Sequence, residues 1–196
     1  MPIQFFPESS EVYYSYRTTI DPKDYPQVHD FYEIILAVEN SMKILLNNDI
    51  LILNPGDLLF IRPDDVHTKI EISPSVHINL AFPSLTMEAL FHYLPKLPSS
   101  ILQSSPDSHV PIVHLSIIDM NMIQNRLNYL NRLPYTSNDE RNTHLRVMLA
   151  DLMYTYIIPK LKQQSLSQKD TSLHCGFHMP FQIYVHHHIY LKAWNI

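Results

Sequence analysis

The order of apolar and polar positions divides the chain into a strand-rich first half and a helix-rich second half. In the first half, short runs rich in apolar, tyrosine and threonine residues are separated by turn residues, a pattern typical of antiparallel strands. The expected strands are residues 11–19, 31–38, 42–46, 50–53, 58–61, 68–72 and 76–82. Regularly spaced short strands predict an antiparallel sandwich or barrel.

Two turns define the strand connections. Asn47, Asn48 and Asp49 separate residues 42–46 from residues 50–53, and such side chains tolerate the positive φ of a tight hairpin. In the second turn, proline is followed by Gly56, which permits a positive φ.

The second half of the chain has helical spacing. We expect a short helix over residues 85–94, with Ser84 as its N-cap, and a loop over residues 95–111. A helix over residues 117–133 is expected from apolar side chains at Ile118, Met122, Leu127 and Leu130. A helix over residues 138–161 is expected from Leu145, Leu149, Leu152, Met153 and Tyr156, and Pro159 should end or kink it. Strands followed by helices predict an α+β fold.

Composition excludes several functional classes. The net charge is -5, from 14 basic and 19 acidic residues, so the chain has no general electrostatic attraction for DNA. Its only glycines are Gly56 and Gly176, too few for a phosphate-binding loop. The single cysteine, Cys175, rules out an internal disulfide. The first residues do not resemble a signal peptide and no apolar run spans a bilayer, so we expect a cytoplasmic protein.

An ordered set of motifs lies in residues 29–82. His29 precedes Asp-Phe-Tyr-Glu; the hairpin is followed by Pro-Gly-Asp, then by Pro63 and His67, and the strand over residues 76–82 ends in Phe82. This arrangement resembles the sensor domain of AraC-family transcription regulators, especially regulators of chitobiose operons. The resemblance extends in layout over residues 11–165. It implies a small cupin (jelly-roll) β-barrel followed by two or three packed helices, a small effector that is often a sugar, a homodimer formed through the helices, no cofactor and no enzymatic activity.

The chain departs from this family at three places. Gln27 stands where a histidine is common, and Glu39-Asn40 replaces a glycine-containing turn, although Asn40 can adopt the left-handed conformation. After Pro180 nothing reads as the helix-turn-helix of the family's DNA-binding half. We therefore expect an effector-binding barrel at 1–83, a helical dimerisation region at 84–165 and a tail at 166–196 from a truncated or frameshifted reading frame. Such a chain would make no direct contact with nucleic acid or membrane.

A metal-dependent cupin enzyme, such as a dioxygenase or isomerase, is the alternative. Cupin enzymes bind a divalent metal through His-x-His, a glutamate and a later histidine, and Gln27, His29, Glu33 and His67 occupy the equivalent positions. Because glutamine is a poor ligand and AraC-like sensors keep such residues without a metal, we expect no functional metal.

The candidate ligand-binding residues lie on the predicted strands. They are Tyr14, Tyr16, His29, Glu33, His67, His77 and Asn79. Polar His77 and Asn79 alternate with Ile78 and Leu80, so either the polar or the apolar face of this strand points into the barrel. If the polar face points inward, these side chains can bind sugar hydroxyls while tyrosine rings stack on the sugar.

Three further features have both a functional and a plain structural interpretation. Pro2, Phe5, Phe6 and Pro7 form either an arm over the bound effector or a frayed terminus. The apolar stripes of the two long helices either form a dimer interface or are fully buried by packing against the barrel. The resemblance favours the dimer. His174, Cys175, His178 and the histidines at 186–188 are expected to belong to a surface tail, because structural zinc sites need more thiolates.

Overall fold

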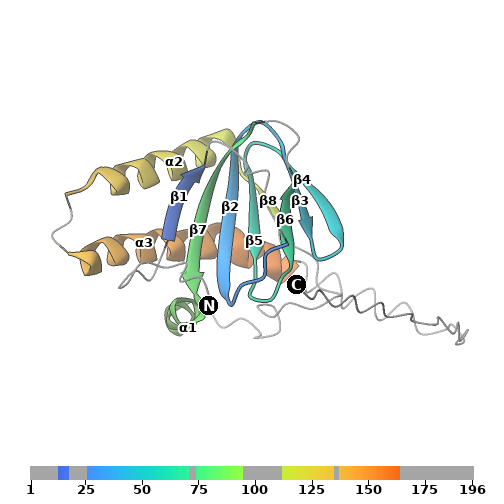
Figure 1. Ribbon diagram of the computed structural model, residues 1–196. Coiled ribbons are helices and arrows are strands. Elements are labelled where there is room, and N and C mark those ends of the chain that lie inside the picture. Colours follow the sequence, from blue (N-terminus) through green and yellow to red (C-terminus); the bar gives the residue numbers. More distant parts are fainter. Residues whose placement is uncertain (1–12, 18–25, 71–73, 95–111, 135–136, 164–196) are drawn as a thin grey trace, which may run out of the picture.

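The protein, seen in a computed structural model, consists of two antiparallel sheets and a layer of helices (Figure 1). The structure describes residues 13–17, 26–70, 74–94, 112–134 and 137–163. A five-stranded sheet has the order β1-β7-β2-β5-β8, and a three-stranded sheet has the order β4-β3-β6. The strands are β1 (Tyr13–Arg17), β2 (Phe31–Glu39), β3 (Met42–Leu46), β4 (Asp49–Leu53), β5 (Asp57–Ile61), β6 (His67–Ile70), β7 (Val76–Pro83) and β8 (Ile112–His114).

The central strands of the five-stranded sheet, β7, β2 and β5, are buried on both faces, and each face belongs to a different core. On β2, residues 32, 34, 36 and 38 pack with the helices, whereas Ile35 and Ala37 pack against the three-stranded sheet. Side chains alternate between the two faces of a strand, so one strand serves both cores. This explains why residues 31–38 form a mostly apolar stretch and do not alternate between apolar and polar residues.

The helices cover one face of the five-stranded sheet. They are α1 (Ser84–Tyr93), α2 (Ile117–Arg132) and α3 (Asn138–Leu152), and α3 continues into the π-helical turn η2 (Met153–Ile157). Figure 1 shows α2 and α3 side by side behind the sheet, with α1 at one end. The hydroxyl groups of Ser116 and Ser137 accept hydrogen bonds from backbone N–H groups in the first turns of α2 and α3. No helix within the described residues has the length and apolar character needed to cross a membrane.

The predicted α+β class and jelly-roll barrel are confirmed. The hairpin pairs Leu46 with Asp49, and Asn47 has φ 53°. Asn40 and Gly56 also take positive φ, at 58° and 94°, as their turn positions require.

Several local expectations are wrong. Ser84 does not cap α1; Pro83 occupies the N-cap, and the Ser84 hydroxyl donates to the Asp30 carbonyl at 3.3 Å. Of the two effects expected of Pro159, an end or a kink, the first is wrong, because the last helix continues to residue 163. The η2 turn lies directly before it and closes with a bond from the Ile158 N–H to the Met153 carbonyl, so the helix widens where proline would otherwise clash. The pattern also fails to predict β8.

Candidate functional site

The space between the two sheets has an apolar part and a polar part. The apolar part is formed by buried side chains from β2, β3, β4 and β5. The polar part is formed by Glu33 on β2, His67 and Lys69 on β6, and His77 and Asn79 on β7. Register explains this grouping, because directly opposed residues in an antiparallel pair share a face.

Register also settles which face of β7 points inward. His77 pairs with Ala37 and Asn79 pairs with Ile35, both members of the inter-sheet core. Of the two alternatives for this strand, the polar face is therefore the one that faces the barrel interior. Lys69 shares the same compartment, because it pairs with Ile44 of that core.

Glu33, His29 and His67 form a compact cluster. Their ligating atoms all lie within 4.8 Å of one another. The Glu33 Oε2 is 3.4 Å from the His29 Nε2 and 3.5 Å from the His67 Nε2. Both separations exceed the usual hydrogen-bond length of about 2.9 Å, so the three groups surround a point without closing on it.

Local structure fixes each member of this cluster. The His29 ring stacks on Phe31 with centroids 3.8 Å apart, and its Nδ1 lies 2.8 Å from the Phe31 carbonyl oxygen. Since a carbonyl only accepts, this Nδ1 carries the proton. The Nε2 then presents a lone pair toward Glu33 when the ring is neutral and an N–H when it is charged. Two backbone bonds to Gln27, of 2.8 and 3.0 Å, hold His67.

The electrostatics favour an ionised Glu33 and a neutral His67. Burial pushes the pKa of Glu33 upward, but the contact with the His29 side chain, the positive charge of Lys69 and the electrostatic interaction with the two histidines outweigh it and leave the pKa below its ordinary value. Burial is also the main cause that lowers the pKa of His67, and the attraction of Glu33 only partly opposes it. Near neutral pH the cluster therefore offers a carboxylate and a neutral imidazole, the form in which histidine binds metals.

A second polar group lies along the same interior wall. The Lys69 Nζ is 3.5 Å from the His77 Nε2, and both His77 and Asn79 are buried. The Asn79 Oδ1 is buried and has no hydrogen-bond partner among the described residues. Lys69 was missed by the sequence interpretation, although it shares strand parity with His67 and alternation alone would have placed it.

The other predicted site residues occupy different positions along the chain and in the sheet. Tyr14 pairs with Leu80 and Tyr16 pairs with Ile78, whereas Ser15 is the residue opposite Asn79. Gln27 is exposed and joins the site through its backbone bonds to His67. The N-terminal arm and the group containing His174, Cys175, His178 and residues 186–188 lie outside the described residues.

Comparison with solved structures finds one with the same fold and others that superpose less well. The apo form of a ToxT variant from Vibrio cholerae superposes with a TM-score of 0.53 at 11% identity, over 82% of this chain and 65% of that one. This chain thus spans less than two thirds of that protein. ToxT bound to an unsaturated fatty acid gives a TM-score of 0.47 at 12% identity over 72% and 52% of the two chains. The EutQ protein from Salmonella typhimurium gives 0.34 at 17% over 39% and 61%.

Sequence comparison supplies the family. No curated protein matches this chain at the sequence level. The family described as the AraC-like ligand binding domain matches residues 12–112, which is more than half of the chain and includes both polar groups of the barrel. The chain therefore belongs to the family of AraC-like ligand-binding domains.

Proposed function

We propose that this chain is the effector-sensing and dimerisation domain of an AraC-type transcription regulator, and that the barrel binds a small sugar-like effector. The observation that carries this proposal is the polar group buried between the sheets. A buried acceptor without a partner costs about 1–3 kcal/mol, so the Asn79 Oδ1 favours a bound molecule that donates a hydrogen bond.

The mixture of donors and acceptors suits a sugar. Lys69 offers donors, Glu33 and the Asn79 Oδ1 offer acceptors, and the two histidines His67 and His77 do either. Hydroxyl groups of a sugar both donate and accept, so they can satisfy such a set in one small volume. A disaccharide of the chitobiose type is the proposed effector. His29 completes the proposed ligand-binding residues. Tyr14 and Tyr16 are no longer proposed to bind the sugar, because they pair with Leu80 and Ile78, which belong to the core on the helix side of the sheet.

We also propose a role for each part of the chain. Residues 1–83 form the effector-binding barrel, residues 84–165 form the helical dimerisation region, and residues 166–196 form a tail. The strand β8 lies within the second range but pairs with β5 of the barrel sheet. The regulator acts in the cytoplasm as a homodimer and without a cofactor. DNA recognition belongs to a separate domain, since a chain with a net charge of -5 lacks the basic surface that DNA binding requires.

Thermal unfolding with a ligand panel tests this function. The panel contains chitobiose, its acetylated form, common monosaccharides and an unsaturated fatty acid. A true effector at 100 times its Kd stabilises the protein by about 2.7 kcal/mol. The stabilisation should disappear in Asn79→Leu, which removes the acceptor at similar volume, and persist in the control Asn128→Leu on the exposed face of α2. Stabilisation by the fatty acid and by no sugar would contradict a sugar effector.

A metal-dependent cupin enzyme is the second candidate, and the His29, Glu33 and His67 cluster favours it. Two imidazoles and one carboxylate suit iron, manganese or zinc. The backbone carbonyl bonded to the His29 Nδ1 is the kind of outer partner that orients a metal-binding histidine. In that case the three residues would hold the ion, which would act as a Lewis acid. Stoichiometric metal in the purified protein that is lost in His67→Ala supports the enzyme; a well-folded protein without metal contradicts it.

A further inference from the structure

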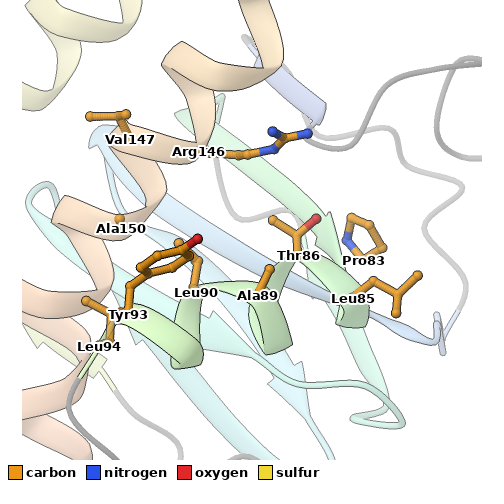
Figure 2. A pocket seen from close by; sticks show the side chains of 10 residues that line it. All are labelled: Pro83, Leu85, Thr86, Ala89, Leu90, Tyr93, Leu94, Arg146, Val147 and Ala150. Carbon is orange, nitrogen blue, oxygen red and sulfur yellow. The ribbon is translucent and has the colours of Figure 1, made fainter. Parts of the chain in front are cut away.

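A groove lies between α1 and α3, on the opposite side of the five-stranded sheet from the polar cluster (Figure 2). Its volume is about 690 Å³. The wall is mostly apolar and comes from Pro83, Leu85, Thr86, Ala89, Leu90, Tyr93, Leu94, Arg146, Val147 and Ala150. Figure 2 shows Arg146 at the end that holds Pro83 and Thr86, and Ala150 at the end that holds Tyr93 and Leu94.

Large apolar side chains in this groove are strongly exposed. Leu85 is 76% exposed, Tyr93 is 89% exposed and Val147 is 54% exposed. A contiguous apolar surface with a polar group at its edge is characteristic of a docking site. The groove therefore needs an occupant, and the course of the chain points to one.

We infer that the N-terminal segment, residues 1–7 (MPIQFFP), docks in the α1–α3 groove. The first argument is the direction of β1. Its register starts with Tyr13 opposite Ala81 and runs to Arg17 opposite His77. The chain before Tyr13 therefore approaches from the end of β7 at Pro83, where α1 begins and the groove opens.

The second argument is chemical complementarity. Six of the seven residues in the segment are apolar, including Phe5 and Phe6, and they suit the apolar wall. Glu8 and Glu11 lie between this apolar run and β1. They would thus pass the end of the groove where Arg146 stands, so charge meets opposite charge at the entrance and apolar residues lie further in.

The third argument is length. The α1 helix of 10 residues is about 15 Å long, at 1.5 Å per residue. Seven extended residues span up to about 23–25 Å. The segment is therefore long enough to follow the groove from Pro83 to Leu94, and β1 tethers it at a high effective concentration.

Disulfide trapping tests this docking in the full chain. In a Cys175→Ser background, Phe5→Cys is combined with Ala89→Cys in the groove or, as the control, with Asn128→Cys at an exposed position of α2. We expect the Ala89 pair to form an intramolecular disulfide at least about tenfold faster than the control, equivalent to about 1.4 kcal/mol of docking preference. Equal rates overturn the inference. Disulfides that link two chains, and not one, also overturn it and identify a second copy as the occupant.

A second measurement does not depend on engineered cysteines. Deletion of residues 2–7, or the pair Phe5→Ser and Phe6→Ser, should raise the fluorescence of an apolar dye, because the groove becomes free. Val147→Glu in the deleted chain should lower that fluorescence again, which assigns the new dye site to the groove. Unchanged dye fluorescence after deletion contradicts the docking. This result is independent of the ligand panel, so it leaves the proposed function untouched.

Discussion

At the scale of single residues, the site depends on charged and polar side chains placed where burial is expensive. Glu33 is tolerated because His29, His67 and Lys69 surround it, and its lowered pKa reflects that compensation. The spacing of His29, Glu33 and His67 allowed this cluster to be predicted from the sequence. The Lys69–His77 contact was not predictable, because it joins β6 and β7 through three-dimensional packing and not through a motif.

The lowered pKa of His67 predicts an acid-sensitive fold. The unfolded chain binds a proton near pH 6.5, whereas the folded protein binds it only at lower pH. Stability is therefore complete above pH 6.5 and decreases as the pH falls below it, by up to about 1.4 kcal/mol per pH unit. Urea unfolding at pH 7.5 and pH 5.5, in the presence of a chelator, measures this difference.

The matched variants are His67→Gln and, on the exposed face of α1, His92→Gln. The His67 variant should lose part of the pH dependence and the His92 variant should keep it. If the stability of the two variants depends on pH to the same extent, burial of His67 is not the cause of the acid sensitivity.

The backbone conformation of Gly56 predicts that a larger residue at this position destabilises the protein. Its φ is 94°, and a Cβ added there would lie 3.1 Å from the Leu115 carbonyl oxygen. Its N–H bonds to the Ala37 carbonyl, and its own carbonyl accepts from the Leu115 N–H, so the turn has little room to move. Gly56→Ala should reduce the free energy of unfolding by about 1–3 kcal/mol in urea titrations. An unchanged midpoint would show that the turn relaxes freely.

At the scale of elements, α2 presents two different faces. Met120, Ile123, Leu127 and Leu130 are buried, whereas Ile118 and Met122 are 68% and 62% exposed. The sequence predicted the helix and its bounds closely, but it assigned Ile118 and Met122 to the same apolar side as Leu127. Apolar spacing identifies a helix without saying which neighbour covers each stripe.

This division of α2 predicts two contrasting alanine variants. Leu127→Ala leaves a cavity beside α3 and should cost about 2–5 kcal/mol of unfolding free energy. Ile118→Ala removes an exposed side chain and should change stability by about 0.5 kcal/mol or less. Thermal unfolding at low protein concentration compares them. Similar losses in both variants would mean that Ile118 is buried in the isolated chain.

At the scale of the whole molecule, the exposed stripe on α2 predicts the mode of dimerisation. Ile118, Met122, Asn125 and Tyr129 follow one another at intervals of four, three and four residues. This spacing puts them on one side of the helix, in a stripe that can pack against a second helix, and we call this stripe the seam. A second copy packing the same stripe would bury it symmetrically. Met122→Glu places a charge in that seam and should convert dimer to monomer in sedimentation velocity. The control, Asn128→Glu, lies beside the seam and should remain dimeric; a wild-type monomer at high concentration would contradict the predicted dimer.

The sequence predicted the order of strands and helices well, because turn residues and periodicity are local signals. It predicted β8 and the widened turn before Pro159 poorly. Those features depend on pairing with β5 and on the accommodation of one proline within a packed helix. The sequence could not show which face of β7 points into the barrel. Side chains on both faces of this strand are buried, and only the pairing register with β2 distinguishes the two faces.

The double burial of the five-stranded sheet has a mechanical consequence. On β7, His77 and Asn79 line one compartment while Ile78 and Leu80 support the helices of the other, so the two rows share a single backbone. The sheet is a partition only one peptide layer thick. A shift of this strand toward an occupant of the barrel is necessarily a shift of Ile78 and Leu80 away from the helix layer, and close-packed interiors resist such a gap. If an effector in the barrel displaces β7, the helices on the other face of the sheet should therefore move with it, through the same strand.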